Sequence, residues 1–155
     1  MLENKEVTWF PSYGGEMRGG TANCTVIISD ELIASPIVKN PDILVVMNDQ
    51  SLRKFQPQIR KMGILLFDSS LIKNPELRAD IEIVGVPATE ISRTIGNTKS
   101  ANMVLLGTLI AKTKLLKEQS TFEALENSVD QREEIVAMNK KAIREGIRFF
   151  EDKKG

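Results

Sequence analysis

The sequence predicts an α/β fold: an open, mostly parallel, doubly wound sheet with an added β-hairpin and C-terminal helices. Short apolar runs of strand length recur between helical patterns, at residues 43–47, 64–67 and 81–84. Runs of this kind are typical of strands that are buried on both faces of a parallel sheet. Residues 25–28 and 32–34, separated by Ser-Asp-Glu, predict a hairpin added to this sheet.

The chain begins with a predicted strand and a glycine-rich loop. Residues 7–10, V-T-W-F, are β-prone and precede P-S-Y-G-G-E-M-R-G-G-T-A-N-C at 11–24. Glycine allows backbone to reach positive φ or to pass close to another group. Two interpretations stay open. The loop is a surface crossover with a solvated Arg18, or it presents backbone N–H groups and the Arg18 guanidinium to an anionic ligand or partner.

Helical patterns follow the predicted strands. Leu52, Phe55, Ile59 and Met62 recur on one helical face, which Pro57 should break by opening a second short helix. Residues 88–95 predict a short helix ended by Gly96, and the mostly apolar residues 102–113 predict a buried one.

The C-terminal third predicts two more helices. Residues 120–123, S-T-F-E, form a capping-box sequence. Leu125 and Val129 follow it and lie on one face of the expected helix. A longer helix is expected from Asp130, with an apolar stripe and a charged outer face; the stripe consists of Val136, Ile143, Ile147 and Phe150.

Composition excludes several kinds of chemistry. Basic and acidic residues both total 21, so there is no electrostatic footprint for nucleic acid and no basic run for a membrane surface. One Cys and no His exclude zinc sites, imidazole catalysis and an iron–sulfur cluster held by four thiolates of this chain. Cys24 is predicted to be a small buried hydrophobe near a strand start. Without a signal peptide or a long apolar run, the expected location is the cytoplasm.

Ligands of open α/β sheets bind beyond the carboxyl ends of the strands. The glycine-rich loop, residues 48–51 and residues 68–70 follow predicted strands and should emerge on one edge, with Asn48 and Asp68 as candidate site residues. Each segment also has a structural interpretation. Asp49 or Ser51 would cap the next helix, and residues 68–70 would form an Asx-type turn. We assign no catalytic residue and no metal ligand.

The run from Val7 to Cys24, continued by S-P-I-V-K-N-P-D-I-L-V-V-M-N, F-D-S-S-L-I and N-M-V-L-L-G, resembles the gamma subunit of 2-oxoacid:ferredoxin oxidoreductases. The matches extend in order to about Gly107, and the T-A-N-C ending is similar to the 2-oxoglutarate enzymes. Gly15 stands where the family usually has Pro. Family members usually begin with a strand and a glycine-rich turn that would lie upstream of Met1, so the chain is expected to lack both.

The resemblance implies a single gamma-subunit domain over residues 1–155, inactive alone. The complete enzyme would convert a 2-oxoacid, first of all 2-oxoglutarate, to an acyl-coenzyme A and pass electrons to ferredoxin. Thiamine diphosphate and iron–sulfur clusters would be held by alpha and beta subunits, with a delta subunit left open. The loop that contacts coenzyme A or a partner would comprise Tyr13, Gly14, Glu16, Arg18, Gly19, Gly20 and Asn23.

Two other functions stay open: a free-standing α/β domain that binds a nucleotide-like anion, and a structural subunit whose glycine-rich loop is an interface element. The 2-oxoacid, the subunit stoichiometry and contact of coenzyme A with this chain are also left open.

Overall fold

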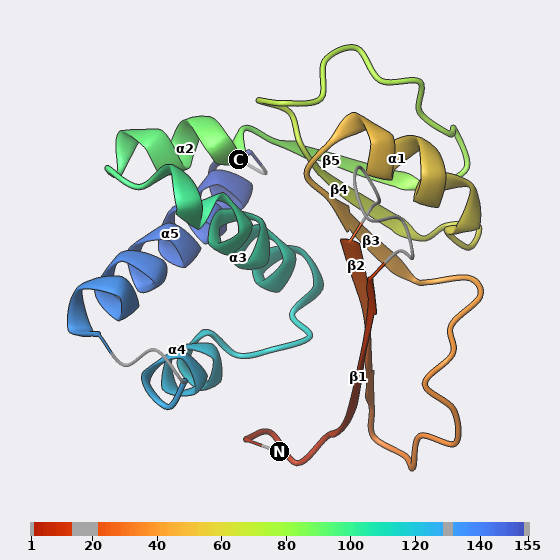
Figure 1. Cartoon of the computed structure of the whole chain (residues 1–155), viewed down its shortest axis with the longest axis horizontal. Coiled ribbons are helices and arrows are strands. Elements are labelled where there is room, and N and C mark those ends of the chain that lie inside the picture. The colour runs from red at the N-terminus through yellow and green to blue at the C-terminus, as the bar shows by residue number, and fades with distance from the viewer. Residues whose placement is uncertain (1, 14–21, 129–131, 154–155) are drawn as a thin grey trace.

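The computed structural model describes residues 2–13, 22–128 and 132–153. A two-stranded antiparallel ribbon comes first, a three-stranded parallel sheet follows, and helices make up the C-terminal half (Figure 1). The elements in chain order are β1 (Glu6–Tyr13), β2 (Ala22–Ser29), β3 (Ile43–Val46), α1 (Asp49–Phe55), the 3₁₀ helix η1 (Gln56–Gln58), β4 (Ile64–Asp68), β5 (Glu82–Val86), α2 (Ala88–Thr94), the 3₁₀ helix η2 (Thr98–Ser100), α3 (Ala101–Thr113), α4 (Glu118–Glu126) and α5 (Glu133–Asp152).

The parallel sheet has the strand order β3-β4-β5 and carries helices on both faces, so the predicted fold class is confirmed. Successive side chains of a strand point to opposite faces, and β4 divides its residues accordingly. Leu66 joins the core formed with α3 and α5. Leu65 and Phe67 join a second core with Leu52 of α1 and with Ile59. Both faces of β4 are therefore buried, as its continuous apolar run predicted.

The predicted hairpin was wrong in its strands. β2 pairs in antiparallel register with β1, from Glu6 opposite Ser29 to Tyr13 opposite Ala22, and residues 32–34 lie in an irregular segment. Among the described residues, this ribbon forms a sheet of its own and is not hydrogen-bonded to the parallel sheet. Residues 32–34 resemble a strand only in their local composition. Leu32 is 87% exposed, so it does not pack into a core as a buried strand residue would.

Helices α3 and α5 cross at very short range. An added Cβ at Gly107 would lie 2.0 Å from the carbonyl oxygen of Ile143, and one at Gly146 would lie 2.0 Å from that of Val104. Thr108, which is fully buried, donates its hydroxyl toward the carbonyl oxygens of Val104 at 3.2 Å and Gly146 at 3.0 Å. Because both glycines lack a side chain, the backbones of α3 and α5 can approach each other closely.

The break at Pro57 was predicted correctly, since Pro57 lies in the first turn of η1. The expected face continues to Ile59, which is buried, but not to Met62, which is 86% exposed in a turn with φ 60°. The short helix α2 ends as predicted before Gly96, whose φ is 91°.

The predicted capping box was wrong. Helix α4 begins at Glu118, so residues 120–123 lie inside it, and its N-cap residue Lys117 makes no side-chain capping bond. Instead, Glu3 accepts a hydrogen bond of 2.8 Å from the backbone N–H of Lys117. This bond and one with the Ser120 side chain lower the pKa of the Glu3 carboxyl. Val129 and Asp130, expected near the junction of the last two helices, lie outside the described residues.

Helix α5 carries the predicted apolar stripe and charged face. Ile143 and Phe150 are buried, whereas Lys141 and Arg144 are exposed. The charges also contact the neighbouring helix, because Lys140 and Arg144 both lie over the ring of Phe122 in α4.

Candidate functional site

The carboxyl edge of the parallel sheet brings Asn48 and Asp68 to neighbouring strand ends, as predicted. β3 pairs with β4 in parallel, with Val46 opposite Phe67, so the residues that follow each strand leave the sheet on one side. Asn48 is exposed and is the N-cap of α1, where its Oδ1 accepts a bond of 2.8 Å from Ser51 N–H. The helix start thus uses a residue one position before the expected Asp49.

Asp68 is fully buried and bonded to protein donors at both carboxylate oxygens. Its Oδ1 accepts from the backbone N–H of Ser70 at 2.9 Å, which is the Asx-type turn that was left open. Its Oδ2 accepts from Thr89, at 3.1 Å from the backbone N–H and 2.6 Å from the hydroxyl. Asp68 therefore caps helix α2 from the end of a neighbouring strand.

A second cap completes the start of α2. The backbone N–H of Glu90 donates to the Ser70 hydroxyl at 3.1 Å. Pro87, at the N-cap position, makes no side-chain capping bond, so the two donors rely on groups that follow β4. The first amides of this helix are thus occupied by the protein itself.

Most of the predicted contact loop lies outside the described residues: Gly14, Glu16, Arg18, Gly19 and Gly20. Tyr13 ends β1, and Asn23 is half-buried in β2 opposite Ser12. The expectation that this loop follows a strand of the parallel sheet was wrong, because β1 pairs with β2 in a separate ribbon.

Cys24 was predicted to be buried and is exposed. It lies in β2 opposite Pro11 of β1, on a ribbon with no parallel-sheet neighbour among the described residues. The prediction failed because the ribbon, unlike a strand inside the parallel sheet, leaves this face open.

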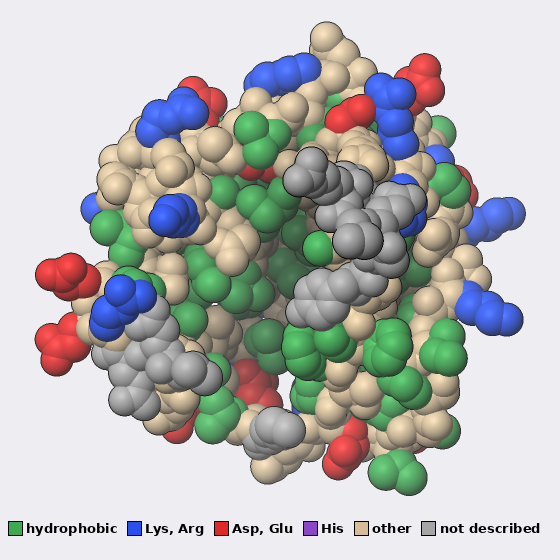
Figure 2. Space-filling model, in the orientation of Figure 1, with side chains coloured by type: hydrophobic (Ala, Val, Ile, Leu, Met, Phe, Trp, Pro, Cys, Tyr) green, Lys and Arg blue, Asp and Glu red, His purple; other side chains and the backbone are tan. Residues whose placement is uncertain are grey.

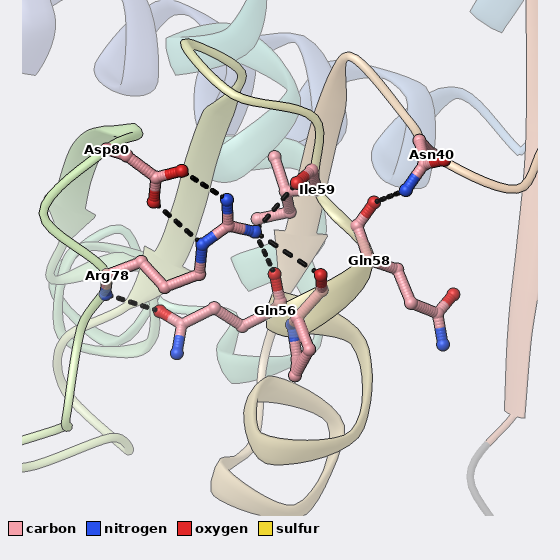
Figure 3. Close-up of polar contacts among 7 residues, drawn as sticks. Asn40, Gln56, Gln58, Ile59, Arg78 and Asp80 are labelled. Carbon is pink, nitrogen blue, oxygen red and sulfur yellow. Dashed lines mark hydrogen bonds and ion pairs between the residues drawn. The ribbon is translucent and has the colours of Figure 1, made fainter.

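A polar cluster surrounds Arg78, and no sequence motif predicts it (Figure 3). Its Nη1 donates to the carbonyl oxygens of Gln56, Pro57 and Ile59, at 3.1, 3.3 and 2.7 Å. Its Nε and Nη2 donate to the two oxygens of Asp80, at 2.8 and 2.6 Å. The hydrogen bonds between the Arg78 and Asp80 side chains raise the pKa of Arg78 and lower that of Asp80.

The Arg78 cluster is structural. Its guanidinium binds the carbonyl oxygens of Gln56 and Pro57 in η1 and of Ile59, the residue that caps η1. Carbonyl groups at a helix end need partners from outside the helix. The Gln56 side chain extends the cluster by donating to the carbonyl oxygen of Glu76 at 3.0 Å. Each nitrogen of the guanidinium already donates to an oxygen of the protein, so this arginine serves to hold the surrounding backbone in place.

Two open hollows lie among the C-terminal helices. One, of about 410 Å³, is lined by Glu126, Glu133, Val136, Ala137 and Lys140. Another, of about 360 Å³, lies between the C-terminal ends of α3 and α5 and the start of α4. Lys140 pairs with Glu126 across the first hollow. Neither hollow is lined by Asn23, Asn48 or Asp68.

Metal-binding clusters and membrane-spanning helices are both absent from the described ranges. No group of three or more acidic, Cys or His side chains there could hold a metal ion. No helix within the same ranges has the length and apolar character needed to cross a membrane.

Two solved oxidoreductase subunits share this fold. The gamma subunit of a keto/oxoacid ferredoxin oxidoreductase from Geobacter sulfurreducens PCA matches with a TM-score of 0.81 and 26% identity, covering 96% of this chain and 82% of that one. Pyruvate oxidoreductase subunit PORC from Thermotoga maritima matches with a TM-score of 0.73 and 27% identity, covering 94% of this chain and 80% of that one. The fold is thus of the oxidoreductase gamma-subunit class.

The sequence profile of the pyruvate ferredoxin/flavodoxin oxidoreductase family matches residues 1–149. The chain belongs to this family, which confirms the resemblance noted in the sequence.

Curated relatives include subunits with two different substrates in their names. Ketoisovalerate oxidoreductase subunit VorA of Methanothermobacter thermautotrophicus is 38% identical over 148 residues, 95% of this chain. 2-Oxoglutarate synthase subunit KorC of Methanocaldococcus jannaschii is 36% identical over 131 residues, 83% of this chain and 70% of its own length. The chain spans 31% of the length of VorA.

A larger oxidoreductase chain contains the same fold. In the 2-oxoglutarate:ferredoxin oxidoreductase of Magnetococcus marinus, solved with 2-oxoglutarate, coenzyme A and succinyl-CoA bound, the match has a TM-score of 0.86 at 21% identity. It covers 97% of this chain and 27% of that one.

Proposed function

We propose that this chain is the gamma subunit of a multisubunit 2-oxoacid:ferredoxin oxidoreductase. The enzyme would decarboxylate a 2-oxoacid oxidatively, form an acyl-coenzyme A and pass the electrons to ferredoxin. The observation that carries the proposal is the match to a solved gamma subunit over 96% of this chain and 82% of that one. Family membership over residues 1–149 supports it independently.

The role of this chain in the complex would be assembly and positioning rather than electron transfer. Iron–sulfur clusters need several thiolate ligands, and the chain has one Cys and no His. The residues present therefore do not fit such a cluster. Thiamine diphosphate and the clusters would belong to alpha and beta subunits, with ferredoxin as the acceptor.

We propose 2-oxoglutarate as the 2-oxoacid. The chain covers 70% of the KorC relative, against 31% of the VorA relative, so its extent is more like that of a 2-oxoglutarate subunit. The T-A-N-C ending of the glycine-rich loop supports the same choice. Sequence identity does not separate the two, at 36% and 38%.

The contact with coenzyme A or with a partner is proposed for the loop that carries Tyr13, Gly14, Glu16, Arg18, Gly19, Gly20 and Asn23. Arg18 is its single cation and suits a phosphate or a carboxylate, to which a guanidinium donates two parallel hydrogen bonds. The neighbouring glycines would allow a ligand to approach the backbone closely.

The test starts with a tagged copy of the chain purified from its own source cells. The proposal predicts co-purifying polypeptides that contain thiamine diphosphate and iron, and coenzyme A-dependent reduction of ferredoxin with 2-oxoglutarate. The same assay with 3-methyl-2-oxobutanoate and pyruvate identifies the substrate. The chain purified alone should hold no iron above background and should be inactive. Activity or stoichiometric iron in the chain alone would contradict the assignment, as would an absence of such partners.

A further inference from the structure

One face of the β1–β2 ribbon is apolar along its whole length. Alternate residues of a strand share a face, and directly opposed residues share it across the pair. Val7 lies opposite Ile28, Trp9 opposite Val26, and Pro11 opposite Cys24. We call these six residues the ribbon face: Val7, Trp9, Pro11, Cys24, Val26 and Ile28.

The ribbon face is open to solvent. Trp9 is 62% exposed, Val26 52% and Val7 41%, and Cys24 is exposed as well. Pro11 and Ile28 of this face are half-buried. On the opposite face, Thr8, Thr25 and Ile27 are half-buried and Phe10 is 50% exposed. Figure 2 shows hydrophobic side chains gathered over the region of the ribbon and the segment that follows it. Contiguous apolar surface of this kind marks a site of interaction.

The ribbon itself indicates that something covers it. A two-stranded hairpin is marginally stable in water unless it packs against another element. Within the described residues, β1 and β2 hydrogen-bond only to each other as strands. Packing of the ribbon face against another surface would supply the missing burial.

Charge and chain length identify the occupant. The ribbon face carries no charged side chain, so the surface that fits it is apolar. The region that matches this chain makes up 31% of the VorA relative and 27% of the Magnetococcus marinus chain. Both of those chains continue well beyond the matched region. In such relatives the equivalent domain is covalently joined to further polypeptide, against which it can pack.

We propose that the ribbon face docks onto an apolar surface of a partner oxidoreductase polypeptide, the part that longer relatives carry in the same chain. This inference rests on the proposed function. The cross-strand pair of Trp9 and Val26 forms the centre of the contact, because Trp9 is the largest side chain of the face and both residues are more than half exposed. Buried Trp residues are typical energetic centres of protein interfaces.

Face-selective substitutions test the proposal. Trp9→Thr and Val26→Thr keep residues that favour strands and remove the apolar surface. The matched control is Phe10→Thr, since Phe10 neighbours Trp9, is 50% exposed and points to the opposite face. Circular dichroism and thermal melting of each variant check that the ribbon change leaves the fold intact.

The measurement is the affinity of each variant for the partner polypeptides, identified by their thiamine diphosphate and iron and separated from the wild-type complex. We expect Trp9→Thr to weaken assembly at least tenfold and Val26→Thr to weaken it less, while Phe10→Thr stays within about threefold of wild type. Equal loss in the Trp9 and Phe10 variants, or wild-type affinity in both, would overturn the assignment of this face.

Two further outcomes separate the inference from its basis. If no partner of this chemistry binds the wild-type chain, the proposed function fails and the inference with it. If the partner binds every variant normally and Trp9→Thr instead abolishes self-association in sedimentation experiments, the occupant is a second copy of this chain and the proposal is wrong. The proposed function would survive that second result.

Discussion

Gly107 of α3 and Gly146 of α5 occupy reciprocal positions, each against the backbone of the other helix. A Cβ at either site would lie 2.0 Å from a carbonyl oxygen, that of Ile143 or Val104. Backbone atoms cannot rotate away as a side chain can, so the two helices would have to separate. This crossing holds the core between the parallel sheet and α5.

Gly146→Ala should destabilise the protein by about 3 kcal/mol or more, because overpacking against fixed backbone outweighs the gain of about 1 kcal/mol in helix propensity. Thermal or urea unfolding of the purified chain measures the loss. Lys141→Ala, on the exposed side of the same helix, is the control and should change stability by less than about 0.5 kcal/mol. An unchanged midpoint for Gly146→Ala would mean that the helices can adjust freely.

Asp68→Ala should cost about 3 kcal/mol, since it leaves the donors of Ser70 and Thr89 without their acceptor in a buried position. Asp68→Asn keeps the shape but turns a donor toward a donor, so it should cost less and still be measurable. At the neighbouring strand end, Asn48→Asp keeps the cap and should be nearly neutral. Chemical unfolding compares the three variants, and equal stability of all three would contradict the capping role of Asp68.

Acid should weaken the Arg78 and Asp80 contact in a defined direction. Hydrogen bonds from Arg78 lower the Asp80 pKa below its usual 3.8, so the folded state binds fewer protons than the unfolded state between the two values. The stabilisation is complete above the usual value and is lost as the pH falls through the lowered one. The difference in unfolding free energy between wild type and Asp80→Asn should therefore be largest near neutral pH and shrink in acid.

The control for this titration is Asp42→Asn, which removes an exposed ion pair with Arg60 and should have little effect at any pH. Unfolding curves between pH 2 and pH 7 give the comparison for both variants. A difference for Asp80→Asn that does not change with pH would show that the carboxylate charge contributes nothing.

Arg18→Ala tests the proposed loop contact. If Arg18 binds a phosphate or a partner carboxylate, its loss removes a charge-assisted bond of about 1.5–3 kcal/mol. Acyl-coenzyme A formation or subunit assembly should fall about tenfold or more, with thermal stability nearly unchanged. Arg18→Lys should restore only part of it, because an ammonium lacks the planar fork of a guanidinium. Wild-type turnover and assembly in the Ala variant would make Arg18 a solvated loop residue.

The parallel sheet was predictable because its signal is local. Continuous apolar runs identified β3, β4 and β5 within two residues of their observed ends, since both faces of such strands are buried. The helix break at Pro57 and the helix end before Gly96 were also predictable. Proline restricts φ and glycine permits positive φ at the position where each residue stands. The carboxyl-edge position of Asn48 and Asp68 followed directly from the parallel arrangement.

What could not be predicted depends on partners far away in the sequence. The cap of α2 comes from Asp68, twenty-one residues before Thr89, and the bond at the start of α4 comes from Glu3, 114 residues before Lys117. The pairing of β1 with β2 spans the glycine-rich loop, whereas the local sequence pattern favours a nearer turn at Ser29. The short alternation in V-T-W at residues 7–9 and in C-T-V at residues 24–26 is the sequence signal for the ribbon face.

The exposed thiol of Cys24 allows a fluorescent label to be attached to the native chain. It is the single thiol of the protein, so an environment-sensitive dye attaches at one known position without any engineering. Because Cys24 faces the same side as Trp9 and Val26, the emission of such a dye, and its quenching by Trp9, would follow the surroundings of this side in real time. Stopped-flow mixing with the proposed partner polypeptide would then measure the rate of binding as well as its equilibrium.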